Sequence, residues 1–187
     1  KQFLLSLLAE RNATAQRDAV FAELQSPDAD VRKQALNTLE TVADGTDVAQ
    51  VIDVMLKAKS TGDRKASQKV LTALCRRDPA AVAPIVAAVT GAAGESRGAL
   101  LQTLGAIGGA DALQAVMADT GNGDETVRNA AVRSLAGWPD ATAAEALLKL
   151  VGTTTDDVHR VLALRGYVRV VTLPSGRDPA ATAGLLA

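Results

Sequence analysis

The chain has 187 residues, of which 48% are hydrophobic and 22% charged, so it can form a sizeable core and is not typical of a disordered protein. Its net charge of −1 gives no overall field that would attract nucleic acid or an anionic membrane. The single cysteine, Cys75, excludes an internal disulfide and a multi-cysteine metal site.

Hydrophobic residues recur at helical spacing along the chain, whereas aromatic residues, which strands favour, make up only 2% of it. The first apolar segment, from Phe3 to Leu8, is followed at once by Glu10 and Arg11. It is shorter than the roughly 18–20 residues of a membrane span, so we interpret it as an ordinary helix rather than a targeting segment. The periodicity and the turn residues predict helices over residues 2–11, 14–25, 28–43, 47–59, 64–76, 79–90, 96–107, 110–119, 125–136, 140–151, 157–171 and 178–187.

Turn residues separate these helices. Asp28 and Asp124 each precede a helix, where a carboxylate can accept the free amide protons of the first turn. Pro84 lies inside a predicted helix, where its ring would clash with the preceding turn. We therefore expect a loose or 3₁₀ turn over residues 79–82 and regular helix from about Ala83.

A repeated pattern organises the chain: an acidic turn, an arginine, and then a stripe of alanine and leucine. We place the arginine position at Arg32, Arg97, Arg128 and Arg160, and in one copy at Ser67, with intervals between 30 and 35 residues. Repeats of this length, each a pair of helices, bury their apolar faces by stacking. The stripe predicts one buried row that consists of Leu36, Leu39, Leu71, Leu74, Leu101, Leu104, Val132, Leu135 and Leu164.

The start of the first helix in residues 28–32 and 124–128, an Asp followed by Val and Arg, resembles the short bacterial HEAT repeats. The resemblance covers nearly the whole chain. It implies an all-α superhelix, a HEAT-like solenoid of about five to six helix pairs that forms one domain over residues 1–187. It also implies a surface for protein binding or scaffolding, without a cofactor.

Residues 136–167 resemble the end of HEAT arrays in larger, multidomain bacterial proteins. The chain also ends about ten residues into a predicted helix, with no polar cap. We therefore expect a fragment of a longer polypeptide. The compartment stays open between the bacterial cytoplasm and periplasm.

The arginines of the repeat could form a row of anion contacts. A structural role is favoured, because an arginine one turn into each first helix lies beside an acidic inter-repeat turn and can tie a repeat to the loop of its neighbour. We predict this structural ladder for Arg32, Arg97, Arg128 and Arg160.

Positive charge is concentrated in residues 57–77, where Asp63 is the only acid before Asp78. An ordinary solvated face and a binding patch for an acidic partner both fit such a stretch. The candidate binding residues are Lys57, Lys59, Arg64, Lys65 and Lys69, and we expect the first four to crowd one inter-repeat edge.

Two further residues could belong to a site. Trp138, in a turn before Pro139, would be a binding anchor if exposed and a cover for the end of the core if buried. His159 is the only histidine, and without a second histidine or a cysteine nearby a role as metal ligand or catalytic base is not favoured. No nucleophile motif or phosphate loop appears, so we expect no catalytic residue, metal or cofactor.

The sequence leaves two functions open. The first is a non-catalytic interaction, scaffolding or spacer module that binds a protein partner or another domain of the parent polypeptide. The alternative is an enzyme or nucleic-acid-binding module that resembles HEAT-like DNA glycosylases or bilin lyases, for which Trp138, Asp140 and the basic stretch would supply parts of a groove. A membrane-surface role is not favoured, because no helix combines a basic face with large exposed apolar residues.

Overall fold

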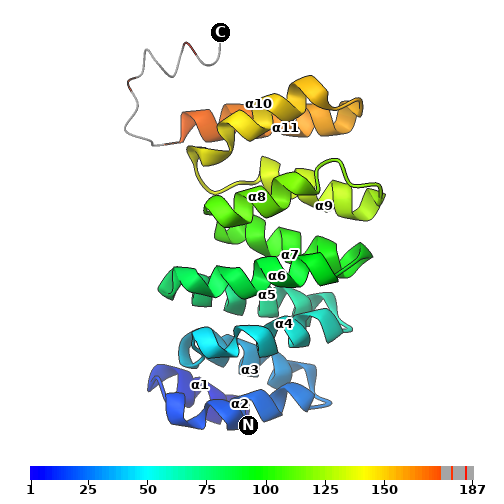
Figure 1. Cartoon of the computed structure of the whole chain (residues 1–187). Helices are drawn as coiled ribbons and strands as arrows, with labels where there is room; N and C mark the ends of the chain where they lie inside the picture. The colour runs from blue at the N-terminus through cyan, green and yellow to red at the C-terminus, as the bar shows by residue number, and fades with distance from the viewer. Residues whose placement is uncertain (174–177, 179–183, 185–187) are drawn as a thin grey trace. The chain divides into compact units, whose positions relative to one another are not determined.

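The computed structural model describes residues 1–173, 178 and 184, and every regular element among them is helical (Figure 1). The eleven α-helices are α1 (Gln2–Glu10), α2 (Arg17–Ala22), α3 (Ala29–Val42), α4 (Val48–Lys57), α5 (Thr61–Arg77), α6 (Val82–Gly91), α7 (Gly94–Ile107), α8 (Ala110–Ala118), α9 (Glu125–Ala136), α10 (Ala144–Thr153) and α11 (Asp157–Thr172). Short 3₁₀ helices cover Thr14–Gln16, Glu23–Gln25, Gly45–Asp47, Pro79–Ala81 and Ala141–Ala143. The all-α prediction is confirmed, whereas the predicted helix 178–187 lies, except for 178 and 184, outside the described residues.

The chain divides into two compact units, Lys1–Ile85 and Val86–Ala187. In the first unit α3 packs on both α1 and α5, while α2 packs on α3 and α4 packs on α5. In the second unit α9 packs on both α7 and α11, α8 packs on α7 and α9, and α10 packs on α11 (Figure 1). Each unit therefore consists of helix pairs in which the first helices, α1, α3 and α5 or α7, α9 and α11, lie against one another.

The expected irregular turn before Pro84 is confirmed. Asp78 accepts a hydrogen bond from the Ala80 N–H at 3.0 Å and caps a 3₁₀ turn over Pro79–Ala81. The α-helix then begins at Val82, so Pro84 lies in its first turn, where the missing N–H would have no partner inside the helix.

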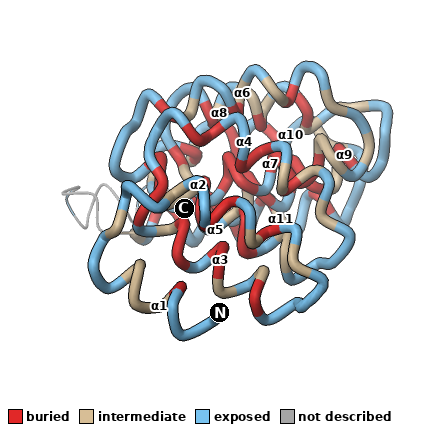
Figure 2. The backbone as a smooth tube through the Cα atoms, turned by 90° about the horizontal axis from the view of Figure 1, so that it is seen from below, coloured by how far each residue is buried: buried red, intermediate tan, exposed pale blue. Residues whose placement is uncertain are grey.

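Buried residues follow the contacting faces of the helices (Figure 2). The predicted row is at most 1% exposed at Leu36, Leu39, Leu71, Leu74, Leu101, Leu104, Val132 and Leu135. The prediction is wrong for Leu164, which is 49% exposed. The equivalent residue of α9, Val132, lies on the side that α11 covers, and within the described part of the chain no helix covers that side of α11.

The helix caps define the repeat length. Asp28, Ser60, Asp124 and Asp156 each accept a hydrogen bond from the first turn of a first helix, and they are separated by 32 residues or twice that number. A small buried residue follows the same 32-residue spacing at Ala35, Ser67, Ala99, Ala131 and Ala163.

This register corrects the placement of Ser67. Ser67 aligns with the buried alanines and not with the arginines, and the arginine of its repeat is Arg64, 32 residues after Arg32. The repeat without an arginine at this position is the third, which has Ser96 there and Arg97 one residue later. In that repeat the N-cap is Ala93, which offers no side-chain hydrogen bond.

Candidate functional site

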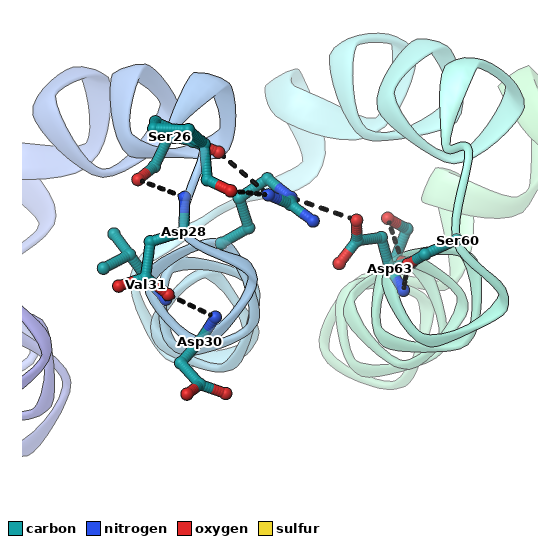
Figure 3. A network of polar contacts seen from close by, with 9 residues as sticks. Ser26, Asp28, Asp30, Val31, Ser60 and Asp63 are labelled. Atoms are coloured by element: carbon teal, nitrogen blue, oxygen red, sulfur yellow. Dashed lines mark hydrogen bonds and ion pairs between the residues drawn. The ribbon is translucent and has the colours of Figure 1, made fainter.

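The repeat arginines bind the turn that leads into their own helix. Nη1 of Arg32 donates to the carbonyl oxygens of Ser26 at 2.9 Å and Pro27 at 3.1 Å (Figure 3). The contact to the carbonyl six residues earlier recurs between Arg64 and Ala58 at 3.3 Å, Arg128 and Asn122 at 2.7 Å, and Arg160 and Thr154 at 2.8 Å. These guanidinium groups satisfy carbonyl oxygens of the inter-repeat loops, which supports a structural role.

Two arginines also reach carboxylates outside their own turn. Nε of Arg32 donates to Oδ2 of Asp63, in the first turn of α5, at 3.1 Å, and so joins two repeats (Figure 3). Nε of Arg97 donates to Oδ2 of the buried Asp119, after α8, at 2.8 Å. Since both ion pairs are partly shielded from water, they are worth more than exposed pairs, which typically contribute up to about 1 kcal/mol.

A cavity of about 680 Å³ lies beside Arg32 in the first unit. Leu24, Leu36 and Val54 form its apolar lining. Its polar lining includes Arg32, Asp53, Lys57, Lys59, Ser60 and Asp63. We call this the basic cavity, because three basic side chains face two acidic ones.

The two lysines of the basic cavity differ in their contacts. Nζ of Lys57 donates to Oδ2 of Asp53 at 2.8 Å, one helical turn earlier, and both side chains are mostly exposed. Lys59 is exposed and makes no hydrogen bond or ion pair with the described residues. An exposed pair such as Lys57–Asp53 exchanges partners at little cost, so both lysines are available to an acidic ligand.

A second cavity, of about 400 Å³, occupies the equivalent place in the second unit. It is lined by Arg128, Leu150, Thr153, Thr154, Thr155, Asp156 and His159, which follow the lining residues Arg32, Val54, Lys57, Ala58, Lys59, Ser60 and Asp63 by 96 residues, or three repeats. The repeat therefore builds the same cavity twice. Threonines occupy the second cavity where the first has its two lysines.

The structure brings together only part of the predicted basic patch. Lys57 and Lys59 line the basic cavity, whereas Lys65 and Lys69 are exposed residues of α5 that do not line it. Arg64 donates to the carbonyl of Ala58 and belongs to the arginine ladder, so the expectation that it offers its charge to a partner is not supported by its geometry.

Trp138 cannot be a surface anchor, because its side chain has no exposed area. Its Nε1 donates to Oγ1 of Thr142 at 3.2 Å, and the ring covers the end of the core. Asp140 accepts from the Thr142 N–H at 2.8 Å as a helix cap. Both residues have structural roles, and this removes the aromatic and acidic parts of the groove considered for a glycosylase-like enzyme.

His159 is also buried, with Nε2 2.6 Å from Oδ1 of Asn129. It takes the place in α11 that Asp63 takes in α5. Its backbone N–H donates to Asp156 at 2.9 Å and lowers the pKa of that carboxyl group below its usual value. Within residues 1–173 and the two isolated described positions, no group of three or more His, Cys, Asp or Glu residues could hold a metal ion.

These features define an all-α repeat protein in which polar side chains mainly cap helices and join loops. Residues 82–167 match the family model described as HEAT repeats, so the chain carries HEAT repeats, as its sequence pattern indicated. No curated protein matches the chain. One solved crystal structure, titled as an engineered protein of the Northeast Structural Genomics Consortium, is similar over 90% of this chain and 89% of that chain, with 19% identity and a TM-score of 0.44. In the described part of the chain, no helix has the length and apolar character to cross a membrane.

Proposed function

We propose that the chain is a non-catalytic protein-interaction or scaffolding module whose basic cavity binds an acidic segment of a protein partner or of another domain of its parent polypeptide. The observation that supports this most is the pair of equivalent cavities. Their framework is shared, including Arg32 and Arg128, and the lysines are added at one of them. HEAT repeats are in general a protein-interaction architecture, which agrees with this proposal.

The lining of the basic cavity fits an extended acidic peptide with apolar side chains. Leu24, Leu36 and Val54 can contact an apolar side chain, while Lys57 and Lys59 lie at the loop beside them. Carboxylates of the ligand would pair with these lysines, which steers association and adds specificity more than raw affinity.

The geometry favours a peptide over duplex nucleic acid. Tight duplex binding uses many phosphate contacts, often about 6–10, spread along the backbone. The basic cavity has two lysines that are not committed to the fold, beside the acids Asp53 and Asp63. We further propose that residues 1–187 form one module of a longer bacterial polypeptide.

Fluorescence anisotropy with a panel of labelled acidic peptides containing Glu and Leu tests this proposal. The double variant Lys57→Glu and Lys59→Glu should weaken binding by about tenfold or more, since each close charge pair contributes an appreciable fraction of the affinity. The matched control is Lys65→Glu with Lys69→Glu, which changes the net charge equally outside the cavity and should alter affinity by less than about threefold.

Three results would contradict the proposal. They are failure of every acidic peptide to bind, equal weakening by both double variants, and binding of duplex DNA that is tighter than peptide binding and falls steeply with salt. The last result would support the nucleic-acid alternative.

A further inference from the structure

One side of α11 exposes a row of aliphatic side chains. Val161, Leu164 and Val168 are 48%, 49% and 44% exposed, and Val158 at the start of the helix is 63% exposed. The spacing of three and four residues places Val161, Leu164 and Val168 on one face over two turns. We call these three residues the outer face of α11.

The equivalent face of α9 is covered by α11. Ala136 of α9 lies against Gly166 of α11, and Asn129 of α9 lies within hydrogen-bonding distance of His159. Val132 lies between these two positions and has no exposed area. Asn129, Val132 and Ala136 are thus the face of α9 that receives the next first helix.

A step of one 32-residue repeat leads from this face of α9 to Val161, Leu164 and Val168. The same relation holds one repeat earlier, where Gly98 and Gly105 of α7 lie against Ala130 and Ser134 of α9. In the second unit, then, the face that α11 exposes is the one through which α7 and α9 each contact the first helix that follows them in the chain.

We propose that the outer face of α11 is the docking surface for the first helix of a further repeat in the same polypeptide. Continuity of the helix-on-helix interface carries this inference. A terminal repeat of a solenoid needs a polar outer face for solubility, and α11 instead has two valines and a leucine where α9 has Asn129, Val132 and Ala136. This inference deepens the proposal of a longer polypeptide and is independent of the basic cavity.

The size of the face favours a covalently linked helix over a second copy of the chain. Stable complexes between separate proteins typically bury about 800 Å² on each partner, far more than a two-turn stripe of aliphatic side chains supplies. A helix in the same chain needs less area, because linkage raises its effective concentration at the face to the order of millimolar. The caps Asp124 and Asp156 then place the cap of the next first helix about 32 residues after Asp156, near position 188.

Thiol labelling tests the proposal, because the only natural cysteine, Cys75, is buried and can be replaced by alanine. In this background Leu164→Cys reports on the outer face, and Asp111→Cys reports on an exposed turn of α8. The labelling rates are compared between residues 1–187 and the natural polypeptide that continues past Ala187. We expect Leu164→Cys to react at least about tenfold more slowly in the longer polypeptide, and Asp111→Cys to react equally in both.

Equal reactivity of Leu164→Cys in the two proteins would overturn the proposal, as would a gene product without a helix near position 188. Protection of Leu164→Cys in residues 1–187 that grows with protein concentration would assign the face to a second copy instead. Hydrogen exchange in the unsubstituted proteins provides a readout that does not depend on the variants: the amides of α11 should exchange more slowly in the longer polypeptide, and unchanged exchange would contradict the proposal.

Discussion

Gly166 of α11 lies directly against the backbone of Ala136 in α9. A Cβ atom on Gly166 would be 2.8 Å from the Cα of Ala136 and 3.0 Å from its carbonyl oxygen. Because both are backbone atoms, neither can turn aside as a flexible side chain would. The approach of α9 and α11 therefore depends on the absence of a side chain at Gly166.

The Gly166→Ala variant should lose about 1–3 kcal/mol of unfolding free energy, since the added methyl group must push the two helices apart. Urea unfolding measures this loss. The matched control is Gly152→Ala in α10, where an added Cβ meets nothing within 4 Å. The control should be neutral or more stable by about 0.5–1 kcal/mol, because alanine restricts the unfolded chain. Equal stability of the Gly166→Ala variant and the unsubstituted protein would contradict the described packing.

Leu104 has no exposed area and lies in α7 between α8 and α9. The Leu104→Ala variant should lose about 2–5 kcal/mol, from lost burial and from the cavity left behind. Leu148→Ala, at a position 52% exposed in α10, should stay within about 0.5 kcal/mol of the unsubstituted protein. A loss below about 1 kcal/mol at Leu104 would show that the repeat register is wrong.

Asp124 caps α9 by accepting hydrogen bonds from the N–H groups of Thr126 at 2.8 Å and Val127 at 3.4 Å. The Asp124→Ala variant leaves these donors without a side-chain partner and should cost about 1 kcal/mol in thermal or urea unfolding. Asp124→Asn retains an accepting oxygen and should recover most of this loss. If asparagine and alanine cost the same, the cap does not contribute as the geometry indicates.

Burial raises the pKa of the Cys75 thiol from its ordinary value of 9.0 to about 11, and the charge of Asp78 adds to the shift. The folded chain therefore keeps a proton that the unfolded chain releases in this interval. This contribution to stability is fully present below about pH 9 and is lost as the pH rises toward about 11. In urea unfolding over this range, the unsubstituted protein should lose stability more steeply than Cys75→Ala. Parallel stability curves would contradict the raised pKa.

Much of the fold could be predicted because helix formation leaves a strong local signal. The apolar periodicity and turn residues located the described helices to within a few residues, and the constraint of Pro84 gave the start of α6. The register of the second repeat was harder to predict. A shift of three residues still keeps an apolar stripe on one face of a helix, so Ser67 could take the place of Arg64. The spacing of Asp28, Ser60 and Asp124 would have fixed the register, since caps do not tolerate such a shift.

The candidate site could be predicted only in part, because charge is visible in a sequence but its local use is not. Lys57 and Lys59 were predicted from composition and line a cavity. Arg64 comes from the same basic stretch, yet its guanidinium binds a loop carbonyl, which only the folded loop reveals. Burial of Trp138 and exposure of Leu164 depend on which helix lies next to them, and this is a long-range property.

The two equivalent loops allow the proposed binding site to be tested by exchange within one chain. Replacing residues 57–60 by the amino acids of residues 153–156 introduces Lys57→Thr, Ala58→Thr, Lys59→Thr and Ser60→Asp, and keeps a capping side chain at position 60. We predict that the exchanged chain unfolds within a few degrees of the unsubstituted one, as expected for exposed substitutions of at most about 0.5 kcal/mol each, but no longer binds the acidic peptides in fluorescence anisotropy. Unchanged peptide affinity in the folded, exchanged chain would contradict the assignment of the basic cavity as the binding site.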